Sequence, residues 1–317
     1  MWKTYHLCLA SHDEVMCRNH EDYIRYLNSF SEAVLETGAR ALAVSAMSDH
    51  SHNAVQFDSP KVFQRKLRNK YSRYFNAKYS RCGRLGDKFY FCDEMDGIKH
   101  ITAGLNYIMR QGLHHGITAT PFGYRYSSVN TLFRKELGKS ANTALIINEK
   151  RYKYLSGKTQ VPLSQPMSED GLLLLENIID VSYVESVYVT PRNFLLQMNK
   201  ITDERVREEQ MQELSNTQPI TIDVIEKGTA DFDARSILAN EHGRVDKNLL
   251  TDIDLCELID SFYIPRIVKG KIEMASPYIL TREQRIRLAN NIWGDMQAAR
   301  KRINQKQLAR CMCLSYE

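Results

Sequence analysis

Two histidines stand one residue apart in the stretch MSDHSHNAVQF, at positions 50 and 52. The stretch follows the apolar run ARALAVSAM and has the composition of the second strand of a hairpin. Residues two apart on a strand point to the same face of a sheet, so His50 and His52 are expected to share one face. Two neutral imidazoles in that arrangement suit a divalent metal ion. The alternative is a strand that carries two half-exposed histidines and binds no ion.

A tyrosine and a glutamine are four residues apart in the stretch LNYIMRQGLHHG. On a helix this spacing places Tyr107 and Gln111 on one face, where a phenol can act as a nucleophile and a carboxamide oxygen as a ligand. The alternative is a tyrosine whose ring packs in the core. His114 and His115 follow Gly112, where the pattern predicts a loop, so we expect them to be solvated or to face nucleic acid.

Positive charge is concentrated between residues 61 and 88, where Asp87 is the acidic residue. The residues predicted to contact DNA are Lys61, Arg65, Lys66, Arg68, Lys70, Arg73, Lys78, Arg81 and Arg84. The aromatic residues interleaved with them are Tyr71, Tyr74, Phe75 and Tyr79. A basic helix with aromatic rings suits a nucleic-acid backbone and the stacking of unpaired bases. The same aromatic spacing also suits a helix that turns its rings into the core and its cations outward.

The elements that must position these residues can be read from periodicity and from turn signals. Strands are expected at 4–10, 39–47, 50–57 and 89–95. Helices are expected at 21–38, 60–79 and 96–112, with Gly38 ending the first and Ser59 capping the second. This order predicts an α+β fold, a ferredoxin-like split βαβ antiparallel sheet with helices on one face. The layout alone predicts no function.

The whole chain of 317 residues has a net charge of +5 and a composition typical of globular proteins. A soft boundary near residue 150 separates a first domain, 1–150, from a mostly helical region, 151–317. The last helices are basic, and residues 304–315 resemble the first helix of a helix-turn-helix, so this region is expected to pack on the first domain or to contact DNA. Seven cysteines without C-x-x-C spacing indicate reduced thiols and a cytoplasmic protein. No apolar run approaches the roughly 20 residues of a membrane helix.

Taken together, four segments resemble the HUH-class single-tyrosine transposases, and most closely the REP-associated tyrosine transposase branch. They are Tyr5-His6, MSDHSH where the family typically has M-P-N-H-x-H, KYSRYFNAKYSRCGRLG, and YIMRQGLHHG where the family often has Y-I-x-x-N-P-x-x-A-G. The match covers about residues 5–133, and the order and spacing of the segments agree. Ser48 and Asp49 depart from the family's proline and asparagine, and Gly112 from its proline.

The resemblance implies that residues 1–150 form an HUH catalytic domain in which Tyr107 is the nucleophile. His50, His52 and Gln111 would hold a divalent metal, Mg²⁺ or Mn²⁺. The implied activity is a transposase or endonuclease that cleaves and rejoins single-stranded or hairpin DNA through a 5′-phosphotyrosine intermediate. A homodimer that shares its active sites between chains is left open. The alternatives are a domesticated hairpin DNA-binding protein that does not cut, suggested by the altered turn at Ser48-Asp49, and a metal hydrolase of small substrates.

Overall fold

The computed structural model describes residues 2–118, 120–139, 149–150, 165–199, 250–268 and 275–314. Its first part alternates strands and helices: β1 (Lys3–Ala10), α1 (His20–Thr37), β2 (Arg40–Ala46), β3 (His50–Phe57), α2 (Pro60–Tyr79), β4 (Phe91–Glu94), α3 (Gly97–Met109) and the single turn α4 (Gln111–His114). The fold is α+β, as the sequence predicts. In the described ranges every helix is too short or too polar to span a lipid bilayer.

The four strands form one antiparallel sheet in the order β2-β3-β1-β4. The hairpin predicted around Ser48-Asp49 is present, and β3 pairs with β2 on one side and with β1 on the other. The register places His52 opposite Cys8 and Ala54 opposite His6, so His6, His50 and His52 lie on one face of the two central strands.

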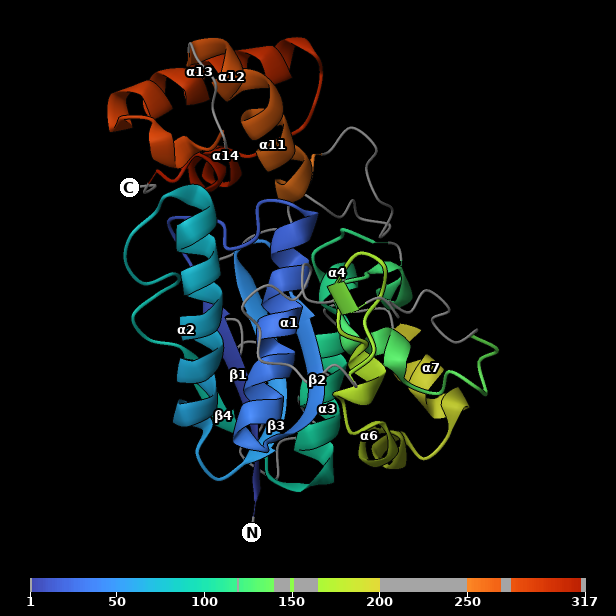
Figure 1. Ribbon diagram of the computed structural model, residues 1–317. Helices are drawn as coiled ribbons and strands as arrows, with labels where there is room; N and C mark the ends of the chain where they lie inside the picture. Colours follow the sequence, from blue (N-terminus) through green and yellow to red (C-terminus); the bar gives the residue numbers. More distant parts are fainter. Residues whose placement is uncertain are drawn as a thin grey trace.

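Helices α1 and α2 cover the opposite face of this sheet, and they run side by side in Figure 1. Tyr26 of α1 donates a hydrogen bond to the hydroxyl of Ser51, which lies between the two histidines and points away from them. Helix α1 ends as predicted at Gly38, whose φ of 70° is left-handed. Helix α2 begins at Pro60 with Ser59 at the N-cap position, as predicted, although the side chain of Ser59 makes no capping hydrogen bond.

Helix α3 corrects the expectation that all helices lie on one face. Its Tyr107 ring packs against His52, on the face of the sheet that α1 and α2 leave uncovered. Successive side chains of β3 point to opposite faces of the sheet. Ser51 contacts α1 on one face, so the next residue, His52, points to the other face and contacts α3. The sheet is therefore sandwiched between α1 and α2 on one side and α3 on the other.

Two further parts of the chain pack around this sandwich. Helices α6 (Val181–Tyr188) and α7 (Pro191–Asn199) add apolar side chains to the hydrophobic cluster that contains the sheet. The last part comprises α11 (Asp252–Leu258), the π-helical turn η4 (Ile259–Tyr263), α12 (Ile264–Ile267), α13 (Arg282–Ala298) and α14 (Gln305–Cys311). Short 3₁₀ turns lie at Pro121–Gly123, Ser128–Thr131, Leu175–Asn177 and Pro277–Ile279.

The C-terminal helices have a hydrophobic cluster of their own, to which Val15, from the loop after β1, also belongs. Figure 1 shows them grouped beyond the end of the sheet at which α1 begins. The division of the chain at residue 150 stays a prediction. Residues 140–148 and 151–164, next to it, lie outside the described ranges, while apolar residues between Leu172 and Met198 contribute to the cluster of the sheet.

Candidate functional site

The site predicted from spacing comes together on the α3 face of the sheet. His50 and His52 are 4% and 0% exposed, and their ring centroids are 5.0 Å apart. Nδ1 of His52 lies 3.0 Å from Nε2 of His6 on β1, so one ring donates a hydrogen bond to the other. Within the described ranges, Nε2 of His52 and Nδ1 of His6 have no hydrogen-bond partner. Buried polar atoms without a partner are rare in folded proteins, and a bound ion or water is one explanation for them.

The ring of His50 is oriented by the residue before it. Oδ1 of Asp49 lies 2.7 Å from Nδ1 of His50, and an ionised carboxylate only accepts hydrogen bonds, so Nδ1 donates. Nε2 of the same ring lies 3.4 Å from Oε1 of Gln111. Gln111 donates from its Nε2 to the backbone oxygen of Tyr107, which turns Oε1 toward the histidines.

Tyr107 is half-buried and stands at the edge of the histidine cluster. Its ring centroid lies 5.1 Å from that of His52, with the two planes perpendicular, and 6.0 Å from that of His6. Helix α3 ends at Met109, and Gln111 opens α4 after Arg110. The sequence therefore predicted the proximity of Tyr107 and Gln111 correctly, although it placed them on one continuous helix.

Two histidines that the sequence analysis set aside belong to the same cluster. His115 is buried, and its Nε2 lies 3.0 Å from Oε1 of Gln111, so the expected solvent-facing position is wrong. His114 packs its ring 5.7 Å from that of Tyr107. Gly112 lies inside the turn α4, and the amide of His115 donates to the backbone oxygen of Gln111, so the helical i, i+4 spacing brings the imidazole of His115 to the side chain of Gln111.

Burial keeps the imidazoles next to Tyr107 neutral. It lowers the pKa of His6 to about 3 and holds the pKa of His52 well below its ordinary value, where His50 and His6 lower it further. The carboxyl of Asp49 has the opposite environment. Burial would raise its pKa, but the charges of Arg310 and His50 outweigh that effect and hold it below the ordinary value. The site thus has two neutral imidazoles, those of His6 and His52, near an ionised carboxylate.

These atoms fit a divalent cation. The unpartnered Nε2 of His52, the Nε2 of His50 and the Oε1 of Gln111 form a set of nitrogen and oxygen donors of the kind that such ions accept. Two neighbouring ligand atoms of an octahedral Mg²⁺ ion are about 3 Å apart. The 3.4 Å between Nε2 of His50 and Oε1 of Gln111 is close to that distance. Within the described ranges, no group of three or more histidine, cysteine, aspartate and glutamate side chains is placed to hold a metal. The third donor here is a glutamine.

The basic helix α2 is less available than its composition suggests. Lys66 and Lys70 pair with Glu36, and Lys70 also pairs with Glu32, both of which lie on α1. Lys78 is almost buried between Glu21 and Asp22, and Arg81 pairs with Glu14. These acidic partners lie within residues 14–36 of the sequence. They are outside the basic segment 61–88, in which Asp87 is the acidic residue.

The other predicted DNA-contacting residues divide into two groups. Lys61, Arg65, Arg73 and Arg84 are exposed. Arg68 is half-buried, and its Nε and Nη2 have no hydrogen-bond partner in the part of the chain that the structure describes.

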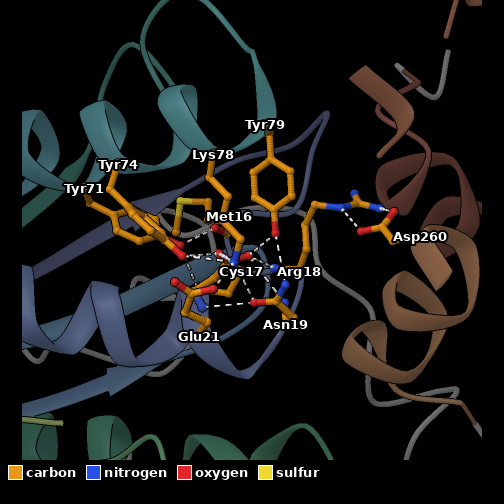
Figure 2. A network of polar contacts seen from close by, with 11 residues as sticks. Met16, Cys17, Arg18, Asn19, Glu21, Tyr71, Tyr74, Lys78, Tyr79 and Asp260 are labelled. Atoms are coloured by element: carbon orange, nitrogen blue, oxygen red, sulfur yellow. Dashed lines mark hydrogen bonds and ion pairs between the residues drawn. The ribbon is translucent and has the colours of Figure 1, made fainter. Parts of the chain in front are cut away.

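The aromatic rings of α2 face inward and do not form a stacking surface. Tyr71, Phe75 and Tyr79 are at most 1% exposed. Tyr74 and Tyr79 donate hydrogen bonds to Asp22, and burial together with that carboxylate raises the pKa of both hydroxyls. Figure 2 shows these two tyrosines and Lys78 turned toward the start of α1. Of the two interpretations of the aromatic spacing, core packing is the one that the structure supports.

Comparison with known proteins gives little beyond the geometry. No family model matches the chain, and no curated protein matches it. Among solved structures, the chain is similar to the REP-associated tyrosine transposase bound to a REP hairpin, at 10% sequence identity and a TM-score of 0.35. The similar region covers 43% of this chain and 80% of that one. At this level of similarity the site must be judged by its own atoms.

Proposed function

We propose that this chain is a metal-dependent transposase or endonuclease that cleaves and rejoins single-stranded or hairpin DNA through a 5′-phosphotyrosine link. One observation carries the proposal. The ring of Tyr107 packs against His52, whose Nε2 has no hydrogen-bond partner among the described residues, and Nε2 of the neighbouring His50 lies 3.4 Å from Oε1 of Gln111. The strand order β2-β3-β1-β4 with antiparallel neighbours supports the ferredoxin-like arrangement that goes with it.

The chemistry follows from the properties of a phosphodiester. Its negative charge repels nucleophiles, and a divalent ion held by His50, His52 and Gln111 would supply polarisation of a non-bridging oxygen. The hydroxyl oxygen of Tyr107 forms a bond to phosphorus and loses its proton, while the bond to the 3′ oxygen breaks and that oxygen gains a proton. The 5′-phosphotyrosine retains the bond energy, so a 3′-hydroxyl of another strand can reverse the step without ATP.

The substrate is a strand whose backbone is accessible. The nucleophile is anchored at the edge of a sheet face, and a stacked duplex would keep the scissile bond and its neighbours away from that face. In the basic segment, Lys61, Arg65, Arg73 and Arg84 are exposed and remain available to phosphates. Tyr107 and its three proposed partners all come from one chain, so the proposed site needs no second subunit.

Incubation with a single-stranded hairpin DNA and Mn²⁺ tests the proposal. The wild-type chain should form a covalent adduct that survives denaturing electrophoresis, and Tyr107→Phe should form none. Tyr90→Phe, which changes another half-buried tyrosine, is the control and should react as the wild type does. An adduct that persists in Tyr107→Phe would refute the assignment. Tight binding of the hairpin without any adduct, under several divalent ions, would instead support the non-cleaving DNA-binding protein.

A further inference from the structure

The turn that leads into the two histidines is held from outside the sheet. Ser48 donates a hydrogen bond to the carboxylate of Asp252, the first residue of α11. Arg310 of α14 donates from Nη1 to Oδ2 of Asp49, which is 261 residues away in sequence. Both positions at which this turn departs from the family pattern are therefore bound by the C-terminal helices.

A continuous buried path connects α14 to His50. Arg310 and Asp49 are 8% and 2% exposed, and His50 is 4% exposed. Arg310 binds Oδ2 of Asp49, while Oδ1 of the same carboxylate accepts from Nδ1 of His50. Each oxygen thus has its own donor, and the carboxylate cannot turn without breaking one of the two bonds. A planar guanidinium is well suited to fix a carboxylate in this way.

We propose that Arg310 is a positioning residue for His50: through Asp49 it fixes the ring with Nδ1–H toward the carboxylate and Nε2 toward Gln111. Partners on the outer nitrogen of a ligating histidine set its tautomer and orientation, and their loss typically lowers metal affinity about 10- to 100-fold. The inference rests on the proposed function and extends it, because it makes the C-terminal helices part of the site and not only a DNA-contacting region.

The chain contains a matched control in Arg18, another buried arginine that joins the C-terminal helices to the first part of the chain. Arg18 donates to both carboxylate oxygens of Asp260 and to the backbone oxygen of Cys311, and within the described ranges none of these bonds reaches a histidine of the site. Figure 2 shows the Arg18–Asp260 pair bridging these two parts. Arg18→Gln therefore disturbs docking, as Arg310→Gln does, and leaves Asp49 and His50 in contact.

The test uses the full chain in two measurements, nitrogen NMR of labelled histidines without metal and titration with Mn²⁺. His50→Gln assigns the His50 signals. Arg310→Gln should change His50 from one tautomer to a mixture and weaken Mn²⁺ binding by about 10-fold. Arg310→Lys, which keeps the charge, should recover part of the affinity. Arg18→Gln should lose thermal stability while keeping the tautomer and the affinity.

The outcomes separate this inference from the proposed function. An unchanged His50 tautomer in Arg310→Gln, or equal changes in Arg310→Gln and Arg18→Gln, would overturn the positioning role. A wild-type chain that binds no Mn²⁺ would contradict the metal site, while the metal-free NMR comparison would still decide whether Arg310 fixes His50. If Arg310→Gln does not fold, Arg310→Lys and the isosteric Asp49→Asn are judged by the same two readouts.

Discussion

Two clusters of buried polar side chains pack against different sides of the sheet, and they differ in how completely their atoms are paired. At the start of α1, Asp22 accepts hydrogen bonds from the backbone of Arg18 and from the side chains of Tyr74, Lys78 and Tyr79. On the α3 face, Nε2 of His52 and Nδ1 of His6 meet no partner among the described residues. The first cluster is complete as it stands, and the second is not.

Under the proposed function, the first cluster is a structural network and the second is a binding site. A buried polar atom without a hydrogen bond costs about 1–3 kcal/mol, so the histidine face is retained at the expense of stability. The Asp22 network satisfies its members and joins α1 to α2, which is what stabilising networks do. Substitutions in the histidine cluster should therefore change ligand binding, and substitutions in the Asp22 network should change the free energy of unfolding.

The largest expected effect follows from removing a donor on the histidine face. In the wild type, Mn²⁺ should raise the melting temperature, because a ligand that binds the native state stabilises it. His52→Leu removes one proposed donor and should weaken Mn²⁺ binding more than about 100-fold, beyond the usual loss from an outer-sphere change. Differential scanning calorimetry with and without Mn²⁺ measures the shift. An equal Mn²⁺-dependent shift in His52→Leu would show that the ion binds elsewhere.

Local spacing predicted the parts of this site that depend on one element. The alternation of β3 placed His50 and His52 on one face, and helical periodicity placed Tyr107 near Gln111, because both relations are set by backbone geometry alone. Pairing between strands was not visible locally. His6 joins the cluster only because the register of β1 and β3 sets it beside His52, so the sequence drew attention to it without giving it a role.

Relations between distant segments account for what the sequence could not predict. The charges of α2 looked uncompensated because Glu32 and Glu36, which neutralise them, lie on another helix. His115 looked solvated because it follows a glycine, yet the chain continues through Gly112 as the helical turn α4, which brings His115 to Gln111. No local pattern connects Arg310 with Asp49, since their hydrogen bond exists only after the C-terminal helices dock.

The next largest effect should come from the satisfied cluster. Asp22→Asn removes the charge that holds Lys78, whose side chain is 7% exposed, and weakens the bonds from Tyr74 and Tyr79. Breaking a buried ion pair typically costs about 3–5 kcal/mol, and Glu21 remains near Lys78, so we expect a loss of about 3 kcal/mol. Urea denaturation measures it. The Mn²⁺-dependent shift in melting temperature should be preserved, and its loss would mean that the two clusters are coupled.

A smaller effect should separate the exposed cations of α2 from the paired ones. Replacing Arg65 and Arg73 with glutamine removes two exposed charges. The DNA-binding constant falls as the salt concentration rises, and for each phosphate contact that is lost on a single strand the magnitude of the slope of log K against log salt should decrease by roughly 0.7. Replacing Lys66 and Lys70 with glutamine removes charges that α1 already neutralises, so the slope should stay close to that of the wild type. Fluorescence anisotropy with a labelled hairpin across a salt series compares the two. Equal slopes for both double variants would place the DNA elsewhere.

The smallest effect concerns the ion pairs between α1 and α2. Burial opposes the ionisation of Glu36, but hydrogen bonds from Lys70 and Lys66 outweigh it and hold the pKa of Glu36 below its ordinary value. The pKa of Glu36 is therefore lower in the folded state than in the unfolded state, where it is about 4.3. The ion pairs of Glu36 stabilise the fold fully above the unfolded-state pKa, and this stabilisation is lost as the pH falls through the folded-state pKa. Glu36→Gln should cost about 0.5 kcal/mol at pH 7, as partly exposed pairs do, and almost nothing once the pH lies below the folded-state pKa of Glu36.

Urea denaturation of both proteins at several pH values, repeated in high salt, measures the difference in the free energy of unfolding. A cost that persists at low pH and in high salt would assign the contribution of Glu36 to packing and not to charge.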